Sequence, residues 1–316
     1  MNEPLVFDPI AMERVWGGRR LEALAGKKLP PDVPIGELWE VVDRPEAQSI
    51  VADGEFRGRS LQDLWKNERE RIFGPALANH PSERFPLLVK LLDAAETLSV
   101  QVHPPLEKAG ELGGEPKTEV WYFWETKPAA TIYAGLKNGT SRDAFEQKLC
   151  DGGVESTLHE IPVHAGESIF IPSGRIHAIG AGNVIVEIQQ NSDTTYRVFD
   201  WNRVGLDGKP RALHIAESMA SIDFEDFEPQ VKNANDPLVA NCPFFHVEKI
   251  QIEKPTDIRP LEAFALAVSL DHPVLCGERR LSCCQFFLIP VTGQNLEVRP
   301  VTLPATLLVT TLPPTK

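Results

Sequence analysis

Prolines occur along the whole of this chain, and they limit what it can fold into. The sequence has 27 prolines among 316 residues, and proline interrupts both helices and central strands. Many short strands joined by turns fit this distribution better than a helical bundle does. The runs between the prolines are rich in β-branched and aromatic residues, so we predict an all-β fold. The expected strands lie at 85–94, 97–103, 118–125, 131–136, 168–172 and 183–190.

A few helices and one domain boundary are expected within this framework. Ser60 and Ser141 are suitable N-caps for helices over the segments SLQDLWKNERERIFG and RDAFEQKL, which we interpret as insertions. The acidic, proline-containing stretch 223–237 has the composition of a linker. We therefore expect a larger domain at 1–235 and a smaller β domain at 236–316.

Charge and cysteine content exclude several classes of function. The net charge of −13 disfavours nucleic acid and anionic membranes as partners, because both bind through clustered Lys and Arg. The five cysteines form an odd set without a C-x-x-C pair, so we expect reduced thiols and neither a disulfide framework nor a zinc ribbon. The first residues lack a basic stretch followed by an apolar run, and no apolar run is long enough to span a membrane. A cytoplasmic protein is expected.

The segment GESIFIPSGRIHAIG, at 166–180, predicts a metal-binding histidine. It places Gly166, Pro172, Gly174 and His177 at a spacing that resembles the second motif of the cupin barrels. In such a segment a strand ends in a proline-containing turn, and the next strand begins by directing a His into the barrel. We therefore expect His177 to be a metal ligand.

Three further residues upstream complete a candidate metal site. Gln101 and His103 lie two residues apart on an expected strand, so their side chains emerge on the same face. Glu119 opens the next expected strand and is the nearest Glu suited to point inward. Two His, one Glu and an amide oxygen suit zinc, and manganese, cobalt or iron are acceptable. Two simpler interpretations stay open, in which Gln101 only forms hydrogen bonds and Glu119 forms a salt bridge with Lys117.

A carboxylate and a guanidinium follow the last of the expected strands. Asp193 and Arg197 are four residues apart in NSDTTYRVFDWNR, around a turn or bulge. At the mouth of a metal-binding barrel they would hold a sugar hydroxyl and stabilise a developing oxyanion. A purely structural ion pair between them is the alternative.

Eight motifs lie in the order and at the approximate spacing of a known family, and together they cover nearly the whole chain. They are RVWGG (14–18), IGELWEV (35–41), GRSLQDL (58–64), LLVKLLDA (87–94), LSVQVHPP (98–105), KTE (117–119), PSGRIHAI (172–179) and NSDTTYRVFDW (191–201). The chain resembles the metal-dependent type I mannose-6-phosphate isomerases, in particular their short bacterial form. Such co-linearity is more specific than any single motif.

This resemblance implies a zinc-dependent enzyme on a cupin (jelly-roll) barrel, with a second, smaller cupin-like domain that holds no metal. The reaction implied is the interconversion of mannose 6-phosphate and fructose 6-phosphate through a cis-enediolate. The expected partner is a small sugar phosphate, and a monomer or weak homo-oligomer is expected. By position, the metal ligands of the family fall on Gln101, His103, Glu119 and His177.

The resemblance also implies roles for residues around the metal. The catalytic arginine of the family falls on Arg197 and its active-site aspartate on Asp193, while its phosphate-contacting Ser and Lys fall on Ser99 and Lys117. Lys117 is also a candidate proton carrier, which requires a strongly lowered pKa, and its two roles compete. Two basic neighbours are further candidates for holding the phosphate, Lys137 and Arg203.

One departure from the family and two other functions are left open. In the longer enzymes, a His proposed to open the sugar ring precedes the Lys of the K-x-E motif, where this chain has Pro116. A cupin oxygenase would use the same barrel with iron, although it commonly shows a His-x-His pair that Gln101 breaks. A sugar-phosphate binder without turnover is the second alternative.

Overall fold

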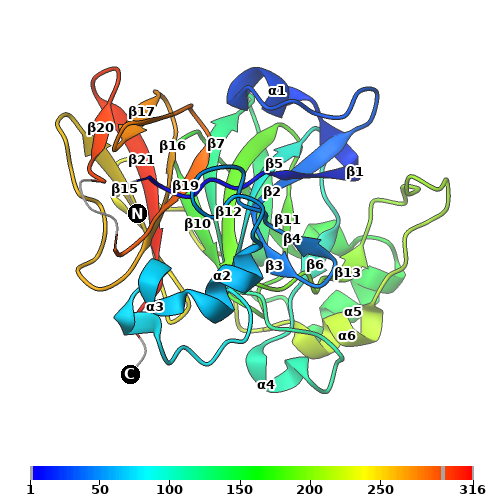
Figure 1. The fold of residues 1–316 in the computed structure, drawn as a ribbon. Coiled ribbons are helices and arrows are strands. Elements are labelled where there is room, and N and C mark those ends of the chain that lie inside the picture. The colour runs from blue at the N-terminus through cyan, green and yellow to red at the C-terminus, as the bar shows by residue number, and fades with distance from the viewer. Residues whose placement is uncertain (1–2, 293–295, 315–316) are drawn as a thin grey trace.

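The computed structural model describes residues 3–292 and 296–314, in which strands predominate over helices (Figure 1). The predicted all-β fold is therefore confirmed in part, as a mostly-β protein that also has short helices. Each of the six runs predicted as strands contains a strand. No helix of this part of the chain is long and apolar enough to cross a membrane.

Two antiparallel sheets form the larger part of the molecule. The order in the six-stranded sheet is β1 (Ile10–Gly18), β2 (Ile35–Val41), β5 (Leu87–Ala94), β12 (Asn183–Gln190), β7 (Glu119–Thr126) and β10 (Ser168–Ile171). The order in the five-stranded sheet is β13 (Tyr196–Phe199), β6 (Val100–Val102), β11 (His177–Ile179), β8 (Thr131–Leu136) and β9 (Leu158–Pro162). Side chains of both sheets share one apolar cluster, which includes Trp121 of β7 and Ile132 of β8. The two sheets therefore pack face to face.

The predicted closed barrel is not found among the described residues. No ladder of paired strands joins an edge of the six-stranded sheet to an edge of the five-stranded sheet, so the two sheets stay separate. Among the described strands, β9 pairs with β8 alone, and Ser168 of β10 bridges on its other side to Lys232 rather than to the five-stranded sheet. The site described below therefore lies between two facing sheets.

The six-stranded sheet is buried on both faces. For this reason the sequence of β5, LLVKLLDA, is an almost continuous run of apolar residues. Alternate residues of a strand point to opposite faces. Leu87, Val89 and Leu91 pack on the side of the C-terminal unit, whereas Leu92 packs toward the five-stranded sheet. Lys90 lies two residues before Leu92 and so faces the space between the sheets.

The C-terminal unit is a second pair of antiparallel sheets around its own apolar cluster. One has the order β14 (Leu238–Asn241), β15 (His246–Ile252), β21 (Ala305–Thr311), β16 (Ala265–Ser269) and β19 (Phe286–Ile289). The other has the order β18 (Arg279–Leu281), β17 (Val274–Cys276) and β20 (Val298–Pro300). Near the N-terminus, Leu5 pairs with Leu288 of this unit, so the first described residues belong to it in space.

Short helices decorate the sheets, as predicted. Ser60 Oγ accepts a hydrogen bond from the Asp63 amide and Ser141 Oγ accepts one from the Ala144 amide, which confirms both as N-caps. The first of these predicted helices is broken at Glu68 into two. The α-helices are α1 (Arg20–Ala25), α2 (Leu61–Asn67), α3 (Arg69–Ile72), α4 (Leu106–Ala109), α5 (Arg142–Cys150) and α6 (Ile215–Ser221). Short 3-10 helices lie at Pro75–Leu77 and Val154–Thr157. A small hairpin consists of β3 (Asp43–Arg44) and β4 (Ala47–Gln48).

The segment 223–237, predicted as a linker, is held against the larger unit. Asp226 forms a bidentate ion pair with Arg175, and Lys232 exchanges backbone hydrogen bonds with Ser168 of β10. This segment is therefore fixed in place before the chain enters β14.

Candidate metal centre and its cavity

One row of side chains crosses the five-stranded sheet. Gln101 of β6 lies opposite His177 of β11 on one side and opposite Arg197 of β13 on the other. Residues directly opposite each other on paired strands share a face of the sheet. Gln101, His177 and Arg197 therefore project together, and Gln101 and Arg197 line the same cavity.

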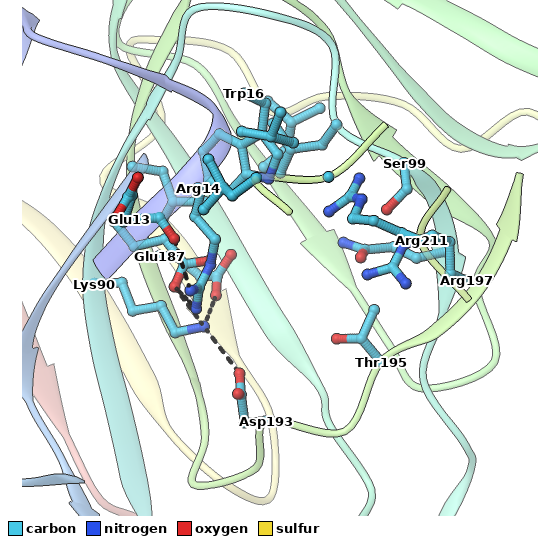
Figure 2. Close-up of a pocket in the computed structure, with 18 of the residues that line it drawn as sticks. Glu13, Arg14, Trp16, Lys90, Ser99, Glu187, Asp193, Thr195, Arg197 and Arg211 are labelled. Atoms are coloured by element: carbon cyan, nitrogen blue, oxygen red, sulfur yellow. Dashed lines mark hydrogen bonds and ion pairs between the residues drawn. The ribbon is translucent and has the colours of Figure 1, made fainter. Parts of the chain in front are cut away.

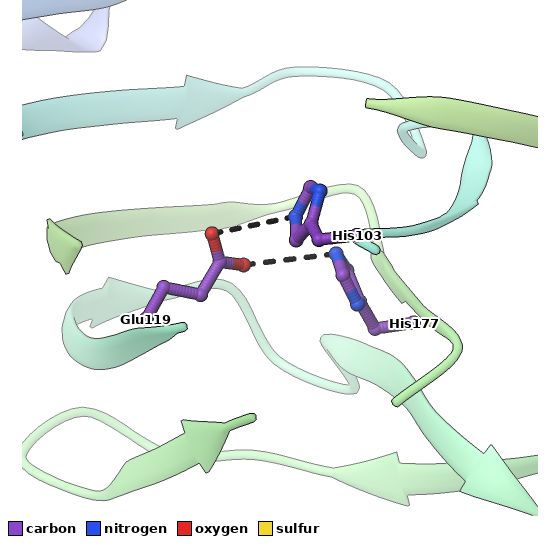
Figure 3. Close-up of side chains that lie close together, drawn as sticks. All are labelled: His103, Glu119 and His177. Carbon is purple, nitrogen blue, oxygen red and sulfur yellow. Dashed lines mark ion pairs between the residues drawn. The ribbon is translucent and has the colours of Figure 1, made fainter. Parts of the chain in front are cut away.

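The structure brings His103, Glu119 and His177 together between the sheets. His103 follows the end of β6, His177 begins β11, and Glu119 begins β7 of the opposite sheet. One ligand atom of each lies within 4.8 Å of the others, and all three side chains are buried. Figure 3 shows the Glu119 carboxylate turned toward both imidazoles, with its oxygens 3.5 Å from Nε2 of His103 and 3.6 Å from Nε2 of His177.

Hydrogen bonds fix both imidazoles in the orientation that a metal requires. Nδ1 of His103 donates to the carbonyl of Thr194, and Nδ1 of His177 donates to the carbonyl of Arg175, each at 2.8 Å. A carbonyl can only accept, so the proton resides on Nδ1 and the lone pair on Nε2. Metal-binding histidines show this arrangement, in which the second ring nitrogen is held by an outer partner.

The charge states of these residues also fit a cation. Burial and then the neighbouring His103 lower the pKa of His177 to about 3, and burial and then the charge of Lys117 lower the pKa of His103. Burial works to raise the pKa of Glu119, but Lys117 and His103 outweigh it and keep that pKa well below 4.5. Two neutral imidazoles and one carboxylate result, which is the protonation state that binds metal.

Apart from Oε2 of Glu119, which is ion-paired with Lys117, two buried ligand atoms have no hydrogen-bond partner among the described residues, Nε2 of His177 and Oε1 of Glu119. Burying a polar atom without a partner is costly, and a metal ion would satisfy both. The donor set of two imidazoles and a carboxylate is one that zinc accepts. The residues present therefore fit a divalent metal.

Lys117 lies against this group. Its Nζ is 2.6 Å from Oε2 of Glu119, 3.4 Å from Nε2 of His103 and 3.6 Å from Oε1 of Glu187. Burial works to lower the pKa of Lys117, whereas Glu119 and Glu187 raise it, and the net shift is upward from 10.5. The lowered pKa required of a proton carrier is thus not found, because two buried carboxylates hold the charged ammonium. The salt bridge between Lys117 and Glu119, which was the alternative to a metal-binding role of Glu119, is present.

A cavity of about 580 Å³ opens beside the metal ligands. Figure 2 shows Lys90 and Asp193 on one side of it and Ser99, Arg197 and Arg211 on the other. The structure therefore places five of the residues predicted for the site in one lining, namely Ser99, Gln101, Lys117, Asp193 and Arg197.

The first side of the cavity is a buried ion-pair network around Lys90. The Nζ of Lys90 lies 3.5 Å from Glu187, 3.8 Å from Asp193 and 4.0 Å from Glu37. Burial raises the pKa of Glu187. Burial would raise the pKa of Glu37 as well, but Lys90 and Arg14 lower it to about 2. The structural ion pair between Asp193 and Arg197, which was the alternative to a role in the site, is not formed, because Asp193 pairs with Lys90.

The second side of the cavity carries excess positive charge. Asp200 accepts hydrogen bonds from both Arg203 and Arg211. Burial lowers the pKa of Arg197, and the neighbouring positive charge of Arg211 lowers it further. Arg203 also pairs with Glu96, whereas Arg197 forms no ion pair among the described residues. Nε of Arg197 and Nη2 of Arg203 are buried and find no hydrogen-bond partner among the described residues. This side of the cavity is suited to an anion.

Comparison with known proteins agrees with this geometry. Residues 6–132 match the family described as phosphomannose isomerase type I, catalytic domain. The chain is 36% identical to the mannose-6-phosphate isomerase of Streptococcus mutans over 292 residues, which cover 89% of this chain and 88% of that protein. The chain belongs to the mannose-6-phosphate isomerase family. A mannose-6-phosphate isomerase of Bacillus subtilis has the same identity over the same shares of both chains.

A solved structure supports the family over the full length of the fold. The mannose 6-phosphate isomerase from Bacillus subtilis is similar with a TM-score of 0.86 and 28% identity, covering 98% of this chain and 100% of that chain. The C-terminal unit is therefore shared with this relative.

Two residues predicted to hold the phosphate lie elsewhere. Lys137 is exposed and donates to the carbonyl of Ser156, away from the residues that line the cavity. Arg203 is near the basic side but is not part of the lining, because its guanidinium turns to Asp200 and Glu96. Both residues are close to the motifs in sequence, yet neither side chain lines the cavity of this member of the mannose-6-phosphate isomerase family.

Several polar lining residues were not predicted. Lys90, Glu187 and Glu37 are charged residues within largely apolar strands, and that pattern could have identified them, since a charge in a buried strand needs a partner. Arg211 lies in the loop after β13 and carried no such signal.

Proposed function

We propose that the protein interconverts mannose 6-phosphate and fructose 6-phosphate in a metal-dependent reaction. The observation that carries this proposal is the convergence of His103, Glu119 and His177 beside a cavity that also receives Arg197. Membership of the mannose-6-phosphate isomerase family supports the same substrate. The cavity, at about 580 Å³, is large enough for a phosphorylated hexose.

The reaction requires a proton to move between C1 and C2 of the sugar through a cis-enediolate. It needs a group that carries the proton and positive charge near O1 and O2. A divalent metal held by Gln101, His103, Glu119 and His177 would supply Lewis acidity there. Arg197 projects beside Gln101, and its planar guanidinium is suited to two neighbouring oxygens.

We infer that Asp193 carries the proton and that Lys117 acts as a charged donor. Asp193 lines the cavity and is partly exposed, so its carboxylate can reach a bound sugar. Lys117 is held protonated by Glu119 and Glu187, which suits it to hydrogen-bond a developing oxyanion. The ammonium would then stabilise charge without exchanging the proton.

We infer that the phosphate binds on the basic side, against Ser99, Arg197 and Arg211. The buried Ser99 hydroxyl and two guanidinium groups line that side, and the Nε of Arg197 is available for an acceptor. Charge-assisted hydrogen bonds from arginine to phosphate are stronger than hydrogen bonds between neutral groups. Lys117, on the metal side, is then free of the competing role of phosphate clamp.

We further propose zinc as the ion, with manganese, cobalt or iron as substitutes, and a cupin jelly roll as the arrangement of the two facing sheets. A division into a catalytic domain at 1–235 and a metal-free domain at 236–316 remains part of this proposal. The separate apolar cluster of the C-terminal unit supports that division.

The test is removal and return of the metal. The purified protein is stripped with a chelator, supplied with zinc or manganese, and assayed for conversion of mannose 6-phosphate with a coupled readout. Restored isomerisation supports the proposal. Oxygen uptake in the iron-loaded protein would instead indicate an oxygenase, and binding of the sugar phosphate without turnover would indicate a binder.

A further inference from the structure

Two adjacent cysteines occupy a tight turn of the C-terminal unit, outside the cavity. Cys283 and Cys284 lie between β18 and β19, in a turn closed by reciprocal hydrogen bonds between Ser282 and Gln285. Cys284 has a φ of +58°, and its amide donates to the carbonyl of Ser269 at 2.8 Å. The two sulfur atoms are 3.5 Å apart. The turn thus presents two thiols in contact.

The two thiols differ in exposure and charge. Cys283 is half-buried, whereas Cys284 is fully buried in the apolar cluster beneath the turn. The hydrogen bond from Cys284 lowers the pKa of Cys283, and burial raises the pKa of Cys284. The outer sulfur is therefore the more reactive thiolate and the inner sulfur is a protected partner in contact with it.

We propose that Cys283 and Cys284 form a redox-active dithiol that a hydroperoxide converts into a vicinal disulfide. In the first step the Cys283 thiolate attacks one peroxide oxygen, the O–O bond breaks, and the Cys283 sulfenic acid forms as an alcohol or water leaves. In the second step the Cys284 sulfur attacks the sulfenic sulfur, the S–S bond forms, and water leaves with the thiol proton. Two thiols and one hydroperoxide become one disulfide, one alcohol and one water.

The backbone makes this disulfide easy to reduce again. Adjacent Cα atoms are about 3.8 Å apart across a trans peptide, below the separation of roughly 4.4 to 6.8 Å that ordinary disulfides adopt. The resulting strain favours reduction, as in labile and regulatory disulfides. The sulfur atoms are already 3.5 Å apart, so rotation of both side chains with a local adjustment of the linking peptide brings them to bonding distance.

The test counts thiols in the folded protein. Cys150 is the exposed cysteine of the chain and is first replaced by Ser, so that it forms no bonds between molecules. The Cys150→Ser protein is exposed to hydrogen peroxide, and remaining thiols are counted with a chromogenic reagent after unfolding. We expect the loss of two thiols, both recovered with dithiothreitol, and a peptide carrying Cys283 and Cys284 that has lost two hydrogens.

A matched variant separates this chemistry from general oxidation. In Cys150→Ser/Cys283→Ser, the buried Cys284 has no partner, and we expect no thiol to be lost under the same exposure. Loss of a single thiol to an acid that dithiothreitol does not reverse would overturn the proposal. So would full retention of thiols at a peroxide dose that oxidises a free cysteine peptide.

Discussion

The ammonium nitrogen of Lys117 lies 2.6 Å from Oε2 of Glu119, within the group of side chains assigned to the metal. A cation that binds Glu119 must therefore share that carboxylate with a permanent positive charge. Repulsion between the ammonium and the metal weakens metal binding, and the effect is large in a buried site.

Replacing Lys117 should accordingly strengthen metal binding. We expect Lys117→Gln to bind zinc about tenfold more tightly or better, because the competing charge is gone. Turnover should fall in the same variant, since the donor to the oxyanion is lost. Zinc affinity is measured by competition with a chromogenic chelator. Lys137→Gln is the control, because Lys137 is exposed and outside the cavity, and equal affinities in both variants would contradict the prediction.

Removal of Arg197 should affect turnover more than folding. We expect Arg197→Ala to lower kcat by about 100-fold or more, as the loss of a charge donor to the transition state usually does. The measurement is steady-state isomerisation by the metal-loaded protein, together with circular dichroism to verify the fold. The exposed Arg142→Ala is the matched control. Unchanged turnover in a folded Arg197→Ala protein would remove this residue from the mechanism.

Replacing Arg211 should weaken binding of the phosphate group. A hydrogen bond to a charged group is worth about 1.5 to 3 kcal/mol, so Arg211→Gln should raise KM for mannose 6-phosphate by about tenfold or more. The inhibition constant of inorganic phosphate should rise with it. Arg203→Gln is the control, because Arg203 contacts the same Asp200 without lining the cavity. Phosphate inhibition that is equal in wild type and Arg211→Gln would show that the phosphate binds elsewhere.

Glu37 should contribute stability that depends on pH. Its pKa is lowered from 4.5 to about 2, against the effect of burial, by Lys90 and Arg14. A lowered pKa in the folded protein stabilises it above the unfolded value, and this stability is lost as the pH falls from about 4.5 through 2. Glu37→Gln should therefore lower the free energy of unfolding on the order of 3 kcal/mol at pH 7.

Urea unfolding of both proteins between pH 8 and pH 3 measures this difference. The gap between wild type and Glu37→Gln should stay constant down to about pH 5 and shrink below it. Glu13→Gln serves as the control, because Glu13 is an exposed carboxylate at the same cavity. A gap that already closes between pH 8 and pH 5 would show that another group is responsible.

Local chemistry explains what the sequence could predict. The strands were predicted correctly because their runs are rich in β-branched and aromatic residues. Ser60 and Ser141 were predicted correctly because a cap acts within one turn of its helix. Strand β2 was not predicted, because Glu37 and Glu40 interrupt its apolar pattern although both are buried. Such charges are understood only once their partners on other strands are known.

Pairing between sheets explains what the sequence could not predict. The residue types of His103, Glu119 and His177 suggested a metal, and the structure places them together, although their distance depends on how two sheets face each other. The sequence suggested an ion pair between Asp193 and Arg197 as one alternative, because the two residues are close in sequence. In the structure Asp193 forms an ion pair with Lys90. Lys137 was chosen as a sequence neighbour of the motifs, and its side chain lies outside the cavity lining.

The alignment of Gln101 between His177 and Arg197 has a consequence for engineering. Their spacing is set by the distance between neighbouring strands, roughly 4.8 Å, and owes nothing to the connecting loops. Grafting longer or shorter loops between these strands should leave the alignment undisturbed, whereas sliding β6 by a single residue would turn Gln101 to the opposite face and dismantle it.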